Sequence, residues 1–203
     1  MTAVIYRDIE QNTAEWLALR AGIVTASELK SVLAKGEGKV RKAYMLRLAG
    51  ERLTGVPADT YENGHMVRGR EMEAEARELY TFAREINIER VGFIRNGDVG
   101  CSPDGLIGTD GMAEIKTKLP HLQIECLLRA DLPPEHRAQV QGALWIAERE
   151  WMAFISYWPG LPLFMHREFR DEAYIANLAA EVERFNAELA EIVEKIKRYG
   201  GAP

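Results

Sequence analysis

The chain has 203 residues, of which 47% are hydrophobic and 28% charged, as is typical of one globular domain with its own core. It lacks an apolar run of about 18 residues, so we expect no membrane span. It also lacks a basic start followed by an apolar stretch, so we expect no signal peptide and a cytoplasmic protein. Two cysteines exclude a disulfide framework, a zinc site and an iron–sulfur cluster, and a net charge of −5 counts mildly against DNA binding without excluding it.

The first part of the chain is predicted to be helical. A helix over 13–20 takes Thr13 as its N-cap and ends before Gly22. Thr25 followed by Glu28 is a capping-box pattern, which opens a second helix. Further segments are predicted as two helices and two loops: helices at about 42–53 and 67–81, loops at 35–39 and 54–63.

The pattern then alternates between short strands and helices. Strands are predicted at 89–94, 106–108, 113–118, 152–157 and 163–169, and helices at 121–129, 135–147 and 171–199. Asp110-Gly111 suits a hairpin turn, because these residues tolerate positive φ. The sequence therefore predicts one domain over 1–203 with an α/β (α+β) fold, a central mixed β-sheet flanked by helices. We expect the last helix to cover the sheet, and an oligomer interface is the alternative.

Two carboxylates and a lysine that could take part in catalysis lie close together in the middle of the sequence. The turn-forming segment at 102–105 contains Asp104, and the strand at 113–118 contains Glu114 and Lys116. A hairpin between them would pair Asp104 near Lys116. Because side chains alternate along strands, all three would share one face.

Two carboxylates beside a lysine suit a hard divalent cation, since Mg²⁺ takes carboxylate, water and phosphate oxygens as ligands. Such a cation polarises a phosphate and lowers the pKa of a bound water, and the lysine orients that water or stabilises the transition state. On the residues alone, a surface salt bridge among the same groups fits the pattern equally well.

Pro103-Asp104 followed by Glu114-Ile115-Lys116 resembles the signature of the PD-(D/E)xK nuclease superfamily. The chain is similar, more narrowly, to the phage lambda exonuclease family, also called the YqaJ-like viral recombinases. Six blocks in family order carry this resemblance: 15–22, 25–28, 69–73 with 76–77, 101–105, 114–116 and 138–141. The resemblance implies a restriction-endonuclease-like core, with the motifs at about 13–169 and a long C-terminal helix at about 171–199.

The resemblance also implies a role for each matched position. Asp104, Glu114 and the main-chain carbonyl of Ile115 would bind the metal, and Lys116 would act on the attacking water. Glu73 and Gln139 would support this site. Without the family, Glu73 reads as a solvated helix residue and Gln139 as a polar residue on a half-exposed helix.

Arg20, Ser27 and Ser102 match the family's residues for a terminal 5′-phosphate. Ser27 lies in the predicted first turn of a helix, where free N–H groups and the dipole attract anions. The planar fork of Arg20 suits phosphate. On sequence alone, Ser27 is better read as a capping residue and Arg20 as a surface arginine.

The resemblance implies a Mg²⁺-dependent 5′→3′ exonuclease, with Mn²⁺ as a substitute, that degrades one strand of linear duplex DNA to mononucleotides and leaves a 3′ overhang. It implies a ring-shaped homotrimer, a single-strand annealing protein as partner, and a phage or prophage gene in a bacterial host. The alternatives are a PD-(D/E)xK endonuclease without end dependence and a non-catalytic DNA-end-binding scaffold. An iron–sulfur Cas4-like nuclease is disfavoured because the cysteines are too few.

Four other residues have no assigned role. We expect His136 to lie on a solvated helix face. The tryptophans are expected to pack in the core, with base stacking as the alternative: Trp145, Trp151 and Trp158.

Overall fold

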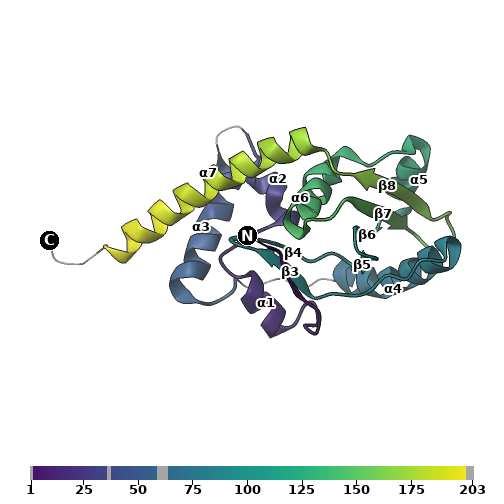
Figure 1. The fold of residues 1–203 in the computed structure, drawn as a ribbon, viewed down its shortest axis with the longest axis horizontal. Coiled ribbons are helices and arrows are strands. Elements are labelled where there is room, and N and C mark those ends of the chain that lie inside the picture. The colour runs from purple at the N-terminus through teal and green to yellow at the C-terminus, as the bar shows by residue number, and fades with distance from the viewer. Residues whose placement is uncertain (1, 36–37, 59–63, 200–203) are drawn as a thin grey trace.

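Two four-stranded mixed sheets form the centre of the protein (Figure 1). The structure is a computed structural model and describes residues 2–35, 38–58 and 64–199. The first sheet has the order β1 (Val4–Tyr6), β3 (Phe93–Asn96), β4 (Val99–Cys101) and β2 (Val24–Thr25). The second has the order β5 (Gly105–Ile107), β6 (Gly111–Thr117), β7 (Trp151–Tyr157) and β8 (Phe164–Phe169).

In each sheet one strand pair is parallel. These pairs are β2 with β4 and β6 with β7, and the other neighbours are antiparallel. The chain passes from the first sheet to the second between Cys101 and Gly105. Residues 102–104 therefore lie where the two sheets meet.

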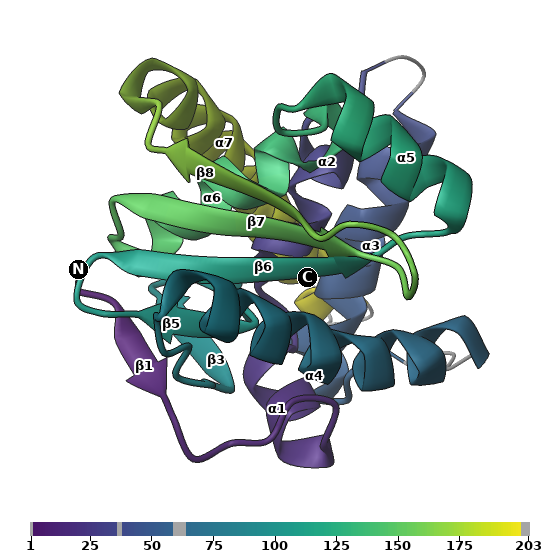
Figure 2. The ribbon, with the colours of Figure 1, turned by 90° about the vertical axis from the view of Figure 1, so that its right-hand side faces the viewer.

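The helices flank these sheets on both sides. Their bounds are α1 Ala14–Arg20, α2 Leu29–Val32, α3 Lys39–Thr54, α4 Gly64–Arg84, α5 Pro120–Arg129, α6 Arg137–Ala147 and α7 Glu172–Lys197, with 3-10 turns at Ala26–Glu28 and Pro134–His136. Helix α4 lies across one face of the second sheet, and α5, α6 and α7 lie on the other side (Figure 2). The C-terminal half of α7 extends away from the sheets beside α3 (Figure 1).

The apolar residues form two clusters, one on each side of the second sheet. Met72, Ala76 and Tyr80 project from one stripe of α4 onto the sheet, at the spacing of four that one helix face requires. The larger cluster joins α2, α3, α6 and α7 to the opposite face. Helix α4 is thereby fixed against β6, which positions Glu73 near the centre of the sheet.

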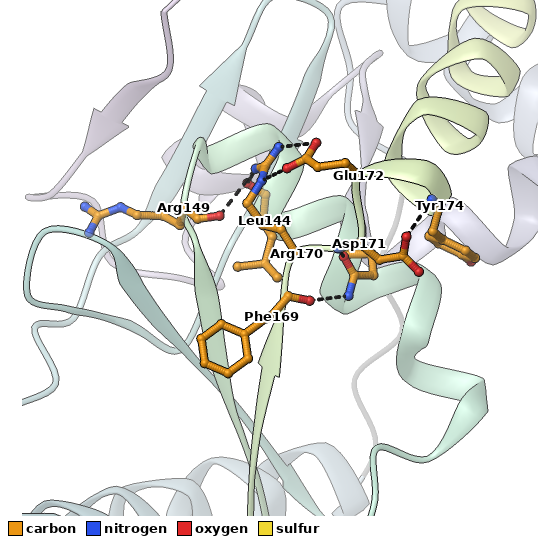
Figure 3. Close-up of polar contacts among 8 residues, drawn as sticks. Leu144, Arg149, Phe169, Arg170, Asp171, Glu172 and Tyr174 are labelled. Atoms are coloured by element: carbon orange, nitrogen blue, oxygen red, sulfur yellow. Dashed lines mark hydrogen bonds and ion pairs between the residues drawn. The ribbon is translucent and has the colours of Figure 1, made fainter.

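The junction between β8 and α7 is tied to α6 by polar contacts (Figure 3). Arg170 donates to the carbonyls of Leu144 and Arg149 at 2.9 and 3.3 Å. The amide of Gln141, fully buried, donates to the carbonyl of Phe169 and accepts from the main chain of Asp171, which caps α7. These contacts satisfy main-chain groups at a helix end and hold α6 in place.

The predicted α/β fold class is confirmed, although the strands form two sheets instead of one. The predicted helices are present with ends shifted by a few residues, and the strand predicted at 89–94 lies at 93–96. Three strands escaped prediction, β1, β2 and β4, because each has only two or three residues and shows little alternation. Of the predicted loops, 36–37 and 59–63 lie outside the described residues, whereas Lys39 and Thr54 already belong to α3.

The predicted capping box is wrong. Thr25 makes no side-chain cap, because it lies in β2 and its N–H donates to the hydroxyl of Tyr44 at 3.2 Å. The carboxylate of Glu28 does not reach back either, since it accepts from Ser31 and Arg47. The segment forms a 3-10 turn followed by the four-residue helix α2.

The hairpin between β5 and β6 turns one residue earlier than predicted. Gly108 takes the positive φ of 57°, whereas Gly111 lies in β6 opposite Ile107. As a result, each residue of β5 faces a β6 residue two positions earlier than predicted. Asp104 therefore does not pair near Lys116, and its N–H donates to the carbonyl of Ala113.

Within the described residues, no helix is long and apolar enough to cross a membrane.

Close packing between α6 and α2 leads to a stability prediction. A Cβ at Gly142 would lie 1.9 Å from Cδ1 of Leu29, whereas a Cβ at Gly50 in α3 would meet nothing within 4 Å. Gly142→Ala should lower the free energy of unfolding by about 1–3 kcal/mol through overpacking. Gly50→Ala should raise it by about 0.5–1 kcal/mol through helix propensity. Denaturant unfolding checks both, and equal stability of the two variants would contradict the packing.

Candidate active site

Asp104 is anchored on β6 by two main-chain hydrogen bonds. Its N–H donates to the carbonyl of Ala113 at 3.0 Å, and its Oδ2 accepts from the N–H of Ile115 at 2.5 Å. Pro103 precedes it and favours an extended approach to the second sheet. The half-buried carboxylate is thus fixed on the central strand by main-chain geometry.

Glu114 is held by two donors at the same oxygen. The ammonium of Lys116 lies 2.6 Å from its Oε1, and the amide of Gln139 donates to that atom at 2.6 Å. Only 4% of Glu114 is exposed. Since Glu114 and Lys116 are two apart on β6, they share a sheet face, as predicted, and Gln139 reaches them from α6.

Glu73 approaches from α4 on the other side of Asp104. Its carboxylate pairs with Arg77, one turn later on the same helix, and Arg77 also donates to the carbonyl of Asp104 at 3.4 Å. Arg77 therefore links Glu73 to the main chain at Asp104. The structure brings together all five residues predicted for the chemical step and their metal site: Glu73, Asp104, Glu114, Lys116 and Gln139.

Negative charge is crowded in this cluster. Burial, together with the carboxylates of Glu114 and Glu73, raises the pKa of Asp104 well above its usual range, and Lys116 offsets this only in part. Burial acts to lower the pKa of Lys116, but Glu114 and Asp104 outweigh it and raise that pKa. Lys116 is therefore protonated at neutral pH, and one ammonium faces three carboxyl groups.

The donor set suits a hard divalent cation. Within the described ranges, no three His, Cys, Asp or Glu side chains converge in the arrangement of an all-side-chain metal site. The two carboxylates of Asp104 and Glu114 are instead the sparse oxygen set that suits Mg²⁺, which keeps waters and substrate oxygens. Burial, together with the carboxylates of Glu114 and Glu73, raises the pKa of Asp104, and this supports the fit because a bound cation would favour the charged carboxylate.

Arg20, Ser27 and Ser102 line one small cavity of about 30 Å³, and Glu114 and Gln139 line it as well. Arg20 donates to Oγ of Ser102 at 3.0 Å. In the part of the chain that the structure describes, Arg20 forms no ion pair with a carboxylate. Burial lowers its pKa, yet a guanidinium stays charged, so this cation is half-buried without a paired anion.

The helix-terminus argument for Ser27 is wrong. Ser27 lies in a three-residue 3-10 turn, which has no substantial dipole, and it is exposed with its hydroxyl 3.4 Å from that of Thr25. What remains at Ser27 is its hydroxyl group at the cavity wall.

Sequence reasoning missed Trp16 and Arg77. Trp16 donates from its indole N–H to Ser102, and Arg77 holds Glu73. Both are four residues from a predicted site residue on the same helix, so spacing alone could have pointed to them.

His136 does not lie on a solvated helix face, as predicted. Its ring packs 5.0 Å from that of Phe154, and its Nε2 is buried without a hydrogen-bond partner. Burial, then the charges of Lys118 and Lys116, lowers the pKa of His136 to about 4. The tryptophans pack as predicted: Trp151 is buried beside α4, and Trp145 and Trp158 pack against the two clusters.

Residues 15–150 match the sequence profile described as the YqaJ-like viral recombinase domain. The chain belongs to this family. A solved structure of an alkaline exonuclease (LHK-Exo) from Laribacter hongkongensis is 36% identical, with a TM-score of 0.84 over 92% of this chain and 97% of that one. The same exonuclease in complex with dAMP gives 37% identity and a TM-score of 0.85, with the same coverage.

A phage-related exonuclease from Haemophilus somnus 129PT is 14% identical, with a TM-score of 0.65 over 86% of this chain and 96% of that one, and shows the fold alone. No curated protein matches the chain. The family resemblance inferred from the six sequence blocks is confirmed.

The crowded carboxylates predict that the metal-free site destabilises the fold at high pH. A carboxyl whose folded pKa is raised gives a stability contribution that is fully present below its unfolded pKa and lost as pH rises through the folded pKa. The metal-free protein should therefore lose stability upward from about pH 4. Asp104→Asn keeps the acceptor for Ile115 and removes the charge. It should raise the melting temperature at pH 8, by about 2–4 °C for each 1 kcal/mol of repulsion relieved.

The measurement is thermal unfolding in EDTA and in excess Mg²⁺ from pH 4 to pH 9. Mg²⁺ should stabilise the wild type more than Asp104→Asn, because a ligand stabilises only the state that binds it. The exposed Asp98→Asn is the control and should behave as wild type. A lower melting temperature for Asp104→Asn in EDTA at pH 8 would refute the repulsion.

Proposed function

We propose that this protein is a Mg²⁺-dependent 5′→3′ exonuclease that degrades one strand of linear duplex DNA. It would release mononucleotides and leave a 3′ single-stranded overhang. The observation that carries the proposal is the shared cavity, in which the donors Arg20 and Ser102 face the same space as Glu114. Family membership and the alkaline exonuclease relatives support the same activity.

The shared cavity explains why cutting would start at an end. A terminal phosphate held by Arg20, Ser27 and Ser102 would leave the next phosphodiester near Asp104 and Glu114. An internal phosphate carries a chain on both sides, whereas a terminal phosphate leaves one side free to enter the small cavity that these three residues line. One nucleotide would be removed per cut, and the relative's complex with dAMP, a nucleoside monophosphate, agrees with such a product.

Each residue of the cluster has a role in the proposed reaction. Asp104, Glu114 and the main-chain carbonyl of Ile115 would hold the metal. When bound, Mg²⁺ (or Mn²⁺ in its place) would polarise the scissile phosphate and lower the pKa of a water. Lys116, protonated at neutral pH, would orient that water and stabilise charge that develops on the phosphate oxygens.

Gln139 and Glu73 would act on this site through their neighbours. The amide of Gln139 keeps the Glu114 carboxylate in one orientation. Glu73, held by Arg77, adds negative charge near Asp104 and would hold a water of the metal shell.

The wider assembly follows from the family resemblance. The protein would form a homotrimer around duplex DNA ends, work with a single-strand annealing protein in phage recombination, and act in the cytoplasm of a bacterial host. Analytical ultracentrifugation would test the trimer.

The activity is tested with linear duplex DNA labelled at either the 5′ or the 3′ end, in Mg²⁺ and in EDTA. We expect labelled mononucleotides early from 5′-labelled DNA only, and no action on closed circles. Nicked circles would establish an endonuclease. Binding without cutting of any substrate would establish a non-catalytic end-binding scaffold.

Lys116→Ala should abolish cutting while DNA binding is retained. Loss of a group that orients water and stabilises charge should lower kcat at least about 100-fold. Lys118→Ala is the matched control, because the ammonium of Lys118 pairs with Glu135 and not with Glu114. Single-turnover kinetics and equilibrium binding in EDTA check both variants. Wild-type cutting by Lys116→Ala would refute this mechanism.

Arg20→Ala should remove the preference for 5′-phosphorylated ends. A charge-assisted hydrogen bond of about 1.5–3 kcal/mol corresponds to a loss on the order of 10–100-fold in kcat/KM for those ends. Duplexes with 5′-phosphate and 5′-hydroxyl ends are compared, with the exposed Arg184→Ala as control. An unchanged preference in Arg20→Ala would place the phosphate elsewhere.

A further inference from the structure

The hydroxyl of Ser102 accepts two hydrogen bonds from one helix. The indole N–H of Trp16 and Nη1 of Arg20 each lie 3.0 Å from its Oγ. Trp16 and Arg20 are one turn apart on α1, so both side chains project from the same helix face. The two donors therefore reach Ser102 together as a unit.

A serine hydroxyl has one hydrogen to donate and two lone pairs that accept. Both lone pairs of Ser102 are used by Trp16 and Arg20. Among the residues that the structure describes, Ser102 Oγ is not the donor in any hydrogen bond, and Ser102 lines the cavity beside Ser27. The direction left to its O–H is the cavity.

We propose that Trp16 is a positioning residue that turns the Ser102 hydroxyl into an obligate donor and so makes the cavity select a phosphoryl anion over a hydroxyl. The inference rests on the proposed end-directed exonuclease activity. It assigns Trp16 to the specificity for the 5′ end. No contact between Trp16 and DNA is needed.

The selectivity follows from what each chain end can accept. A terminal phosphate dianion only accepts hydrogen bonds, so every donor at the cavity finds a partner. A 5′-hydroxyl must also donate, and Ser102 has no lone pair left to receive its hydrogen. A site built of donors therefore binds the 5′-hydroxyl end more weakly, because the hydrogen of that hydroxyl finds no acceptor there.

Trp16 is itself firmly held. Its indole N–H is shared with the carbonyl of Gly92, also at 3.0 Å, and its main-chain N–H donates to the cap residue Thr13 at 3.3 Å. The guanidinium carbon of Arg20 lies 4.0 Å from the centre of the Trp16 ring, which adds a cation–π contact. Trp16 thus orients both donors that face the phosphate, Ser102 through its N–H and Arg20 through its ring.

Trp16→Phe separates the two effects, because phenylalanine keeps an aromatic face for Arg20 and removes the N–H. The ratio of kcat/KM for 5′-phosphorylated over 5′-hydroxyl duplex ends should fall about tenfold, the change that a charge-assisted hydrogen bond predicts. Ser102→Ala should lower the ratio by a similar factor. The double variant should fall no further than Ser102→Ala alone, because both changes remove one function.

A second measurement does not depend on cutting. In EDTA, dAMP should raise the melting temperature of the wild type more than deoxyadenosine does, and Trp16→Phe and Ser102→Ala should reduce that difference alike. Trp151→Phe is the matched control, because Trp151 lies at the opposite end of the second sheet from Lys116. It should keep the wild-type ratio and the wild-type response to dAMP.

Three results would overturn the inference. If Trp16→Phe keeps the wild-type ratio while Ser102→Ala loses it, Trp16 does not orient the hydroxyl and the proposed exonuclease activity stands. If the double variant shows the product of two independent losses, Trp16 acts by another route. If the wild type itself makes no distinction between the two ends, the end recognition in the proposed function fails together with the inference.

Discussion

Repulsion among three carboxylates, one buried and two half-buried, is the constraint to which the rest of the structure responds. Asp104, Glu114 and Glu73 share a region with one ammonium, and burial together with the two neighbouring carboxylates raises the pKa of Asp104. Each carboxylate is held in place by a donor from a different element: the main chain of β6, the amide of Gln139 and the guanidinium of Arg77. The fold therefore prevents the groups from moving apart. Such strain at a site is typical of a place reserved for a cation, at the expense of stability in its absence.

The crossing between the two sheets connects the proposed cation site with the proposed anion site. Ser102 ends the passage from the first sheet and contacts α1, whereas Asp104 begins the second sheet and contacts β6. Only Pro103 stands between them, and its fixed φ limits how far the two can shift relative to each other. A terminal phosphate at Ser102 and a cation at Asp104 would thus be kept at a set separation by covalent geometry. This is the property that removal of one nucleotide at a time requires.

The sequence predicted what depends on local pattern and missed what depends on tertiary contacts. The periodicity of apolar residues located α4, α6 and α7 and the strands of the second sheet, and the motif spacing brought Asp104, Glu114 and Lys116 together. The short strands of the first sheet form because distant segments pair, which no local pattern records. The hairpin register depended on which glycine took positive φ, Gly108 or Gly111, and a turn displaced by one residue shifts the register by two. The contact of Trp16 with Ser102 and that of His136 with Phe154 join segments distant in sequence and left no local pattern, although the four-residue spacing of Trp16 and Arg20 does mark their shared helix face.

The net charge of −5 is a poor guide to DNA binding in this protein, and the two sites explain why. The proposed cation site needs acceptors and contributes carboxylates, whereas the proposed anion site needs donors and contributes a guanidinium and hydroxyls, which an indole helps to orient. Gln139 lies at their border, donating to Glu114 while it lines the cavity of Arg20 and Ser102. The neutral amide of Gln139 thus lies between the negative carboxylate cluster and the positive cavity without adding charge to either. Because the fields are local and opposite in sign, they largely cancel in any sum over the chain, and only the placement of donors and acceptors shows which ligand each would take.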